Sequence, residues 1–70
     1  MMPLIYADQD DALVIKRVNG REEVVRHLEE LGFVPGAYVK VVSQVSGNII
    51  VNIKDSRIAI SKEMASRVMV

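Results

Sequence analysis

Residues 28–36 restrict the fold more than any other part of the chain, because they combine a helix stop with a tight turn. Gly32 follows the last apolar residue of a helical pattern, which is typical of a residue that ends a helix in the left-handed conformation. If the helix ends at Leu31, then Leu28 and Phe33 occupy the positions whose side chains pack together across such an ending. The sequence therefore predicts a backbone reversal and an apolar contact that closes it.

Pro35 and Gly36 predict a type II turn directly after the helix stop. Pro presets φ at the first central position of such a turn, and Gly accepts positive φ at the second. Residues 37–45 then alternate apolar and polar side chains, which predicts a half-buried strand. Its inward-facing residues are expected to be Val39, Val41 and Val45.

An amphipathic helix is predicted over residues 20–31, before the stop. Asn19 and Glu22 resemble a capping box at its start. Arg26 can pair with Glu22 or Glu30 at i,i+4 spacing, and each pair would contribute about 0.2 to 0.5 kcal/mol. The apolar face of the helix consists of Val24, Val25, Leu28 and Leu31.

Two carboxylates, Glu29 and Glu30, lie in the last turn of this helix. The helix dipole disfavours an anion there by about 0.3 to 1 kcal/mol. One interpretation is an acidic tip that keeps the surface soluble, and the other is an acidic patch for a basic partner surface. The single histidine, His27, is expected on the surface.

The other segments are predicted to form short strands joined by tight turns. Residues 13–18 form the first strand. Residues 46–48 form a hairpin, with Gly47 supplying the positive φ of a type II′ turn. In the strand that follows, alternate residues face inward and Ile50 lies on the polar side as a possible interface residue. The inward residues are Ile49, Val51 and Ile53.

The C-terminal third is predicted to contain a second hairpin at Asp55 and Ser56, leading into a strand over residues 57–60. Ser61 is a suitable N-cap for one helical turn over residues 62–66. Residues 67–70 complete the pattern as a last strand.

Size and composition favour one small domain with an aliphatic core, since 50% of the 70 residues are hydrophobic and only 4% are aromatic. We expect an N-terminal arm over residues 1–11 and a domain over residues 12–70. The chain has no cysteine, so neither disulfides nor thiolate-bound zinc can stabilise the fold. We expect closure of a β-barrel to supply the missing stability of so small a core. No segment approaches the about 18 apolar residues of a membrane span, which predicts a cytoplasmic protein without direct membrane insertion.

The charge balance argues against a nucleic-acid partner, because nine basic residues match nine acidic ones. Sequence-independent binding to nucleic acid normally needs a basic excess. The aromatic residues Tyr6, Phe33 and Tyr38 are too few for a base-stacking platform. Weak self-association is compatible with a chain that has no net repulsion.

Neither catalysis nor tight metal binding is predicted. The chain has no Gly-rich phosphate loop and no Cys nucleophile, so we expect no enzyme activity and no cofactor. Asp8, Asp10 and Asp11 lack the oxygen ladder and central glycine of a calcium loop. His27 alone cannot supply the ligand set that zinc or ferrous iron requires.

The motif Leu-x-x-Leu-Gly-Phe-x-Pro-Gly at residues 28–36 resembles the FeoA family of ferrous iron transport proteins. The similarity continues through residues 49–53, 57–60 and 63–70, and it covers residues 12–70. It implies a mostly β fold, namely a small SH3-like barrel of about five antiparallel strands. One helix would follow the first strand, and a short helical turn would lie near the C-terminus. Asp10-Asp11 and residues 48–50 depart from the family pattern, so no family role is transferred to them.

Resemblance to FeoA implies a cytoplasmic accessory module of bacterial ferrous iron uptake. Such a module would bind or regulate the membrane transporter FeoB through its GTPase portion. We expect docking at the helix end, where Glu29 and Glu30 are exposed and the corner is shaped by Leu28, Phe33 and Pro35. The turns beneath this corner are assigned to Gly32, Pro35 and Gly36.

Two alternatives remain. The barrel also resembles the C-terminal SH3-like domain of iron-dependent repressors, which implies an adaptor or regulatory domain. The other alternative is a small nucleic-acid-binding barrel. A chain that begins at Met1, with no DNA-reading helical domain before the barrel, favours the transport module over a repressor.

Overall fold

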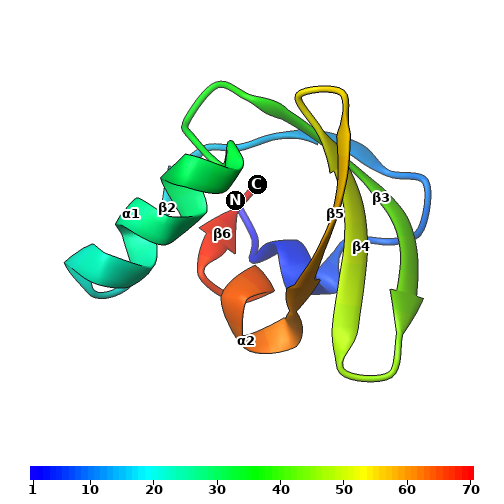
Figure 1. Ribbon diagram of the computed structural model, residues 1–70. Coiled ribbons are helices and arrows are strands. Elements are labelled where there is room, and N and C mark those ends of the chain that lie inside the picture. Colours follow the sequence, from blue (N-terminus) through cyan, green and yellow to red (C-terminus); the bar gives the residue numbers. More distant parts are fainter.

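Two antiparallel sheets form the framework of the computed structural model, which describes residues 1–70 (Figure 1). The larger sheet has the order β1-β3-β4-β5, and the smaller one pairs β2 with β6. The strands are β1 (Ala12–Val14), β2 (Arg17–Val18), β3 (Tyr38–Val45), β4 (Asn48–Ile53), β5 (Ser56–Ser61) and β6 (Val68–Met69). Helix α1 (Glu22–Leu31) follows β2, and a helical turn, α2 (Lys62–Ala65), follows β5. The predicted mostly β fold, with one helix and a short C-terminal helical turn, is confirmed.

The first predicted strand, residues 13–18, is divided between the two sheets. Leu13 pairs with β3, whereas Val18 pairs with β6. Between them, the N–H of Ile15 donates to the Ala37 carbonyl at 2.9 Å, and the Ile15 side chain is fully buried. The chain therefore turns a corner of the barrel within an apolar run, where hydrophobic patterning gives no indication of a bend.

A β-bulge in β3 changes which side chains face the core. Val39 and Val41 are buried as predicted, but the register with β4 shifts between Val41 and Ser43. Beyond the bulge the inward and outward positions are exchanged, because side chains alternate with a period of two. Val45 is therefore 53% exposed, and its predicted inward orientation is wrong. The β4 side chains predicted to face inward, Ile49, Val51 and Ile53, are all buried.

Both hairpin turns differ from their predicted form. In the β3–β4 turn, positive φ falls on the second central residue, Gly47, which is the pattern of a type II rather than a type II′ turn. The β4–β5 turn has Lys54 and Asp55 at its centre, with φ of 48° and 63°, and is a type I′ turn. It begins one residue before the predicted Asp55-Ser56 pair, because Ser56 already belongs to β5.

Helix α1 begins at Glu22 rather than at Gly20, and the predicted capping box is wrong. Arg21 is the N-cap and makes no side-chain capping bond. The side chain of Asn19 instead accepts a hydrogen bond from Arg17 Nε at 3.1 Å. Of the two ion pairs considered for Arg26, the one with Glu22 forms, at 2.6 Å on the exposed surface, and the one with Glu30 does not.

The end of α1 is a Schellman motif followed by a second tight turn. Gly32 adopts φ 109°, and its N–H donates to the Glu29 carbonyl at 3.0 Å. The N–H of Phe33 donates to the Leu28 carbonyl at 2.9 Å, which completes the motif. Next, Gly36 adopts φ 91°, and the N–H of the following residue donates back across the turn to the Val34 carbonyl.

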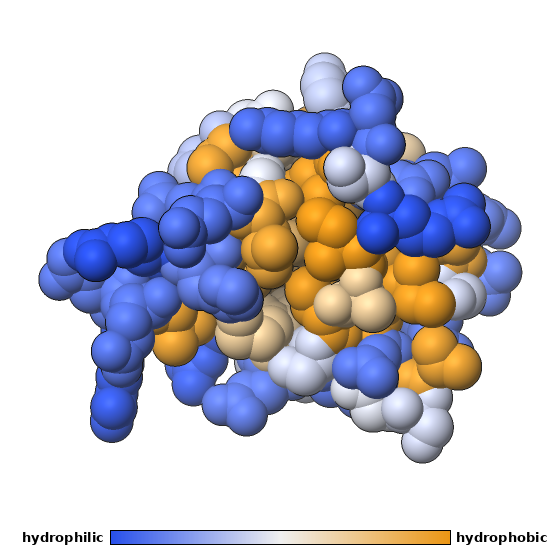
Figure 2. Space-filling view, in the orientation of Figure 1, coloured by the Kyte–Doolittle hydropathy of each residue, from blue (hydrophilic) through white to orange (hydrophobic).

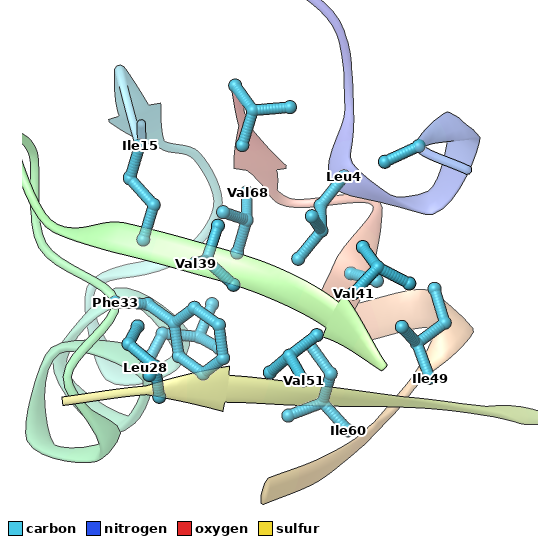
Figure 3. Packing of buried hydrophobic residues seen from close by; sticks show 14 residues of the cluster. Leu4, Ile15, Leu28, Phe33, Val39, Val41, Ile49, Val51, Ile60 and Val68 are labelled. Atoms are coloured by element: carbon cyan, nitrogen blue, oxygen red, sulfur yellow. The ribbon is translucent and has the colours of Figure 1, made fainter. Parts of the chain in front are cut away.

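The core consists of 14 buried apolar residues, and no polar or charged side chain is buried with them. Leu28 and Phe33 lie beside each other in this core, next to Val39 and Val51 (Figure 3). The apolar face of α1 is thereby attached to the larger sheet. Since no buried polar network directs the packing, the free energy of folding depends on apolar burial and close packing.

The N-terminal segment is attached to the last strand. Met2 and Val70 exchange backbone hydrogen bonds of 2.8 and 2.7 Å, and Pro3 pairs with Met69. Leu4, in the short 3₁₀ helix η1 (Leu4–Tyr6), is fully buried in the core. The two chain ends consequently lie together (Figure 1).

Replacing Gly32 by Ala is expected to lower the free energy of unfolding by about 1 to 2 kcal/mol through strain at positive φ. Packing adds a further cost, because a Cβ at Gly32 would lie 3.3 Å from Lys54 Cδ and 3.6 Å from Ile53 Cγ1. Gly36→Ala is the matched control, since Gly36 also has positive φ but no heavy atom lies within 4 Å of its added Cβ. Urea titrations should show the larger loss for Gly32→Ala. Midpoints equal to that of the parent in both variants would contradict both turn assignments.

Candidate docking surface

The end of α1 and the turn after it form an exposed corner above the Leu28–Phe33 contact. Glu29, Glu30 and Pro35 are exposed, whereas Leu28 and Phe33 are 0% exposed. The five residues assigned to this corner therefore fall into two groups. The two carboxylates and Pro35 are available to a partner, while Leu28 and Phe33 hold the corner in place from the core. We call Glu29, Glu30 and Pro35 the acidic corner.

A basic side chain from a distant segment covers the end of α1. The helix has no basic residue in its own last turn. Lys54, on the β4–β5 turn, extends its aliphatic chain over Gly32, with Cδ only 3.3 Å from the position of an added Cβ. A cation near a helix C-terminus interacts favourably with the dipole and the free carbonyls. The aliphatic chain of Lys54 therefore packs on the helix end, while its ammonium forms no ion pair with Glu29 or Glu30.

A second surface with the opposite charge lies on the outer face of the larger sheet. Lys40 on β3, Asn52 on β4 and Arg57 on β5 are cross-strand neighbours that line a shallow groove. Arg57 Nε donates to Asn52 Oδ1 at 3.4 Å. Lys54 and the 77% exposed Tyr38 also line the groove, as does the acidic Asp55. We call Tyr38, Lys40, Asn52, Lys54 and Arg57 the basic groove; the nearby Ile50 is half-buried.

The residues considered as metal ligands do not assemble into one site. No group of three or more His, Cys, Asp or Glu side chains comes close enough to hold a metal ion. Asp11 Oδ2 accepts a hydrogen bond from the backbone N–H of Asp8 at 3.0 Å, and Asp10 adopts positive φ in the same turn. His27 is exposed on α1. The acidic segment is thus organised as a turn at the entry to β1.

Sequence reasoning did not find the basic groove. Lys40, Asn52 and Arg57 come from three strands, and they share one face only once the registers of β3, β4 and β5 are known. The contact of Lys54 with Gly32 depends likewise on where the β4–β5 turn lies. The one sequence feature that pointed to these outward-facing side chains was the alternation of polar and apolar residues along each strand.

Nearly the whole chain matches a known protein family. The model of the FeoA domain matches residues 2–70. The chain belongs to the FeoA family. FeoA proteins take part in ferrous iron transport as accessory proteins, without a catalytic function of their own. Neither helix of this FeoA protein has the length and apolar character that crossing a membrane requires.

Individual relatives agree with this assignment. Over 70 residues the chain is 29% identical to a candidate Fe(2+) transport protein A of Methanocaldococcus jannaschii, and it covers 85% of that protein. An iron uptake regulatory protein (FeoA) of known crystal structure is 32% identical, with a TM-score of 0.91 and coverage of 99% of this chain and 92% of that one. The zinc complex of Stenotrophomonas maltophilia FeoA is 28% identical, with a TM-score of 0.87 and coverage of 100% and 89%.

The SH3-like fold and its likeness to repressor domains are both confirmed. The Stenotrophomonas protein is described as a procaryotic SH3 domain protein. A manganese-dependent transcriptional repressor superposes with a TM-score of 0.86 over 94% of this chain and 38% of its own, at 16% identity. At that identity the likeness to the repressor shows a shared fold alone.

We expect the isolated protein to lack a stoichiometric, submicromolar site for Fe²⁺ or Zn²⁺, because His27 and the carboxylates at Asp8, Asp10 and Asp11 do not converge. Isothermal titration under anaerobic conditions measures this directly. One tight site per chain would contradict the expectation. In that case, His27→Ala and Asp10→Asn would show whether the histidine or the acidic turn binds the metal ion.

Proposed function

We propose that this FeoA protein is a cytoplasmic accessory module that binds the GTPase region of the membrane transporter FeoB and regulates ferrous iron uptake. Membership of the FeoA family supports the pathway. The Stenotrophomonas relative, which is described as a candidate activating factor of bacterial ferrous iron transport, supports a regulatory role. The observation that carries the proposal is the acidic corner, which is exposed and held in place by a fully buried contact.

The two carboxylates of the acidic corner have no evident structural role within the chain. The one ion pair of the protein joins Arg26 to Glu22, so neither Glu29 nor Glu30 has a salt-bridge partner. Their position near the helix C-terminus is unfavourable by about 0.3 to 1 kcal/mol each. A basic surface on a partner would turn this local cost into a favourable interaction between the two proteins.

The backbone under the acidic corner supports recognition of a defined partner geometry. The carbonyl of Glu29 accepts the Gly32 N–H, and the next hydrogen bond joins Phe33 to Leu28. A surface whose backbone is already ordered loses less conformational entropy on binding. Charge complementarity across such a contact would mainly raise the association rate and the specificity.

A regulatory adaptor outside the transport system is the second candidate. The superposition on a manganese-dependent repressor favours it, because there the same fold is one part of a larger regulator. The two candidates differ in their partner. The transport module should bind the purified FeoB GTPase region, whereas the adaptor should not.

Glu29→Lys combined with Glu30→Lys should weaken binding to the purified GTPase region and remove its salt dependence, because the proposed complementarity is reversed. Helix stability should be kept or improved, since cations favour the helix C-terminus. Titrations at low and high salt measure both effects, with thermal unfolding as the check on folding.

The matched control is Glu23→Lys combined with Glu63→Lys. Both residues are exposed and lie in the first turns of α1 and α2, so the net charge changes equally at a different surface. This variant should retain affinity for the GTPase region. If the Glu29/Glu30 variant binds as well as the parent at both salt concentrations, the acidic corner is not the docking surface.

A further inference from the structure

Strand β5 presents a backbone edge without a partner. It is the last strand of the larger sheet and is bonded to β4 alone. No backbone hydrogen bond outside the β4–β5 ladder involves residues 56–60. In Figure 1 β5 lies at the front of the molecule, and β6, which appears between β5 and α1 in this view, is paired with β2 alone. An edge of this kind is a ready template for another extended segment.

The register identifies the groups that point outward from this edge. Ile53 and Ser56 flank a two-residue turn and form the first hydrogen-bonded pair of the ladder. Pairs alternate along an antiparallel ladder, so the N–H and C=O groups of Arg57 and Ala59 point away from β4. Arg57 and Ala59 are both exposed, and β5 contains no proline to block strand addition.

The two flanks of the edge differ in chemistry. On the outer face, Arg57 belongs to the basic groove with Lys40 and Lys54. On the other flank, Ile58 of β5 is only partly buried against the core. Figure 2 shows apolar side chains along the surface between α1 and β5. Alternate residues of an added strand would therefore meet cations on one side and apolar groups on the other.

We propose that β5 accepts an extended peptide segment in which acidic residues alternate with apolar ones, as an additional strand of the sheet. Charge complementarity selects this occupant. The groove is lined by three basic side chains and one carboxylate, although the whole chain has no net charge. These residues are Lys40, Lys54, Arg57 and Asp55. A second copy of the chain is less suitable, because it would bring two basic grooves to the same face. The site goes beyond the proposed contact with the GTPase region, which uses the acidic corner.

The recognition mode predicts which amides respond to a ligand. Main-chain hydrogen bonds supply the affinity in strand addition, and side-chain pairs across the strands supply the specificity. A bound segment should therefore protect the outward N–H groups of Arg57 and Ala59. The N–H groups that already lie in the β4–β5 ladder should change little.

The test uses two soluble peptides with blocked ends, one alternating Glu and Val and the other alternating Lys and Val. Amide exchange measured by NMR should slow by about tenfold or more at Arg57 and Ala59 when the Glu peptide is saturating. The Glu peptide should also bind about tenfold more tightly than the Lys peptide at low salt. Equal affinity for both peptides, or unchanged exchange at these two amides, would overturn the proposal.

Three variants separate the contribution of backbone hydrogen bonds to peptide affinity from the contribution of charge. Ala59→Pro removes an outward N–H without removing a ladder bond, and it should abolish binding of the Glu peptide. Arg57→Glu leaves two basic and two acidic side chains along the groove, so it should abolish the preference for the Glu peptide. Arg21→Glu, at the exposed start of α1, makes the same charge change away from the groove and should leave affinity unaltered.

The outcome does not depend on the proline variant. If Ala59→Pro fails to fold, two results still test the proposal. They are the amide exchange of the parent protein and the relative affinity of Arg57→Glu for the two peptides. Concentration-dependent protection of Arg57 and Ala59 without peptide would identify a second copy as the occupant. That result would contradict the proposed acidic segment.

Discussion

The packing of Leu28 against Phe33 across the end of α1 is the interaction on which the rest of the structure depends. Leu28 is the one fully buried residue of the helix, so it is the main anchor of α1 in the core. A helix of 10 residues would be marginal in water by itself, because helices shorter than about 12 to 15 residues need tertiary packing. The Schellman motif brings Phe33 back beneath the helix, and the chain enters β3 from there. One local contact therefore joins the helix to the barrel.

The same junction explains how a chain without net charge presents two surfaces of opposite sign. Helix α1 ends in Glu29 and Glu30, whereas the sheet carries Lys40 and Arg57 on its outer face. Lys54 links the two surfaces, because it lines the basic groove and also extends over Gly32 at the helix end. An accessory protein with one acidic and one basic surface has the means to contact two different partners. In the proposed account, the acidic corner meets the transporter's GTPase region and the edge of β5 takes an acidic segment.

Features set by neighbouring residues could be predicted from the sequence, and features set by strand pairing could not. Ser61 caps α2 as expected, since its Oγ accepts the Met64 N–H at 3.1 Å within one turn of chain. Val45 was misplaced because the bulge in β3 arises from pairing with β4. The β4–β5 turn was misplaced because Lys54 and Asp55 lack the Gly or Asn that marks a type I′ turn. For the candidate surfaces, the exposed carboxylates of α1 followed from helical periodicity, whereas the groove and the free edge appear only with the sheet registers.

Hydrogen exchange at the Phe33 amide tests the central claim most directly. The N–H of Phe33 donates to Leu28 across the helix end, while Val51 lies in the central strand β4. If the helix and the barrel form one cooperative unit, Phe33 should exchange only through global unfolding, with the same free energy of opening as Val51. Fast exchange at Phe33 through local opening, with Val51 still protected, would contradict the account, because the helix end would then open independently of the barrel.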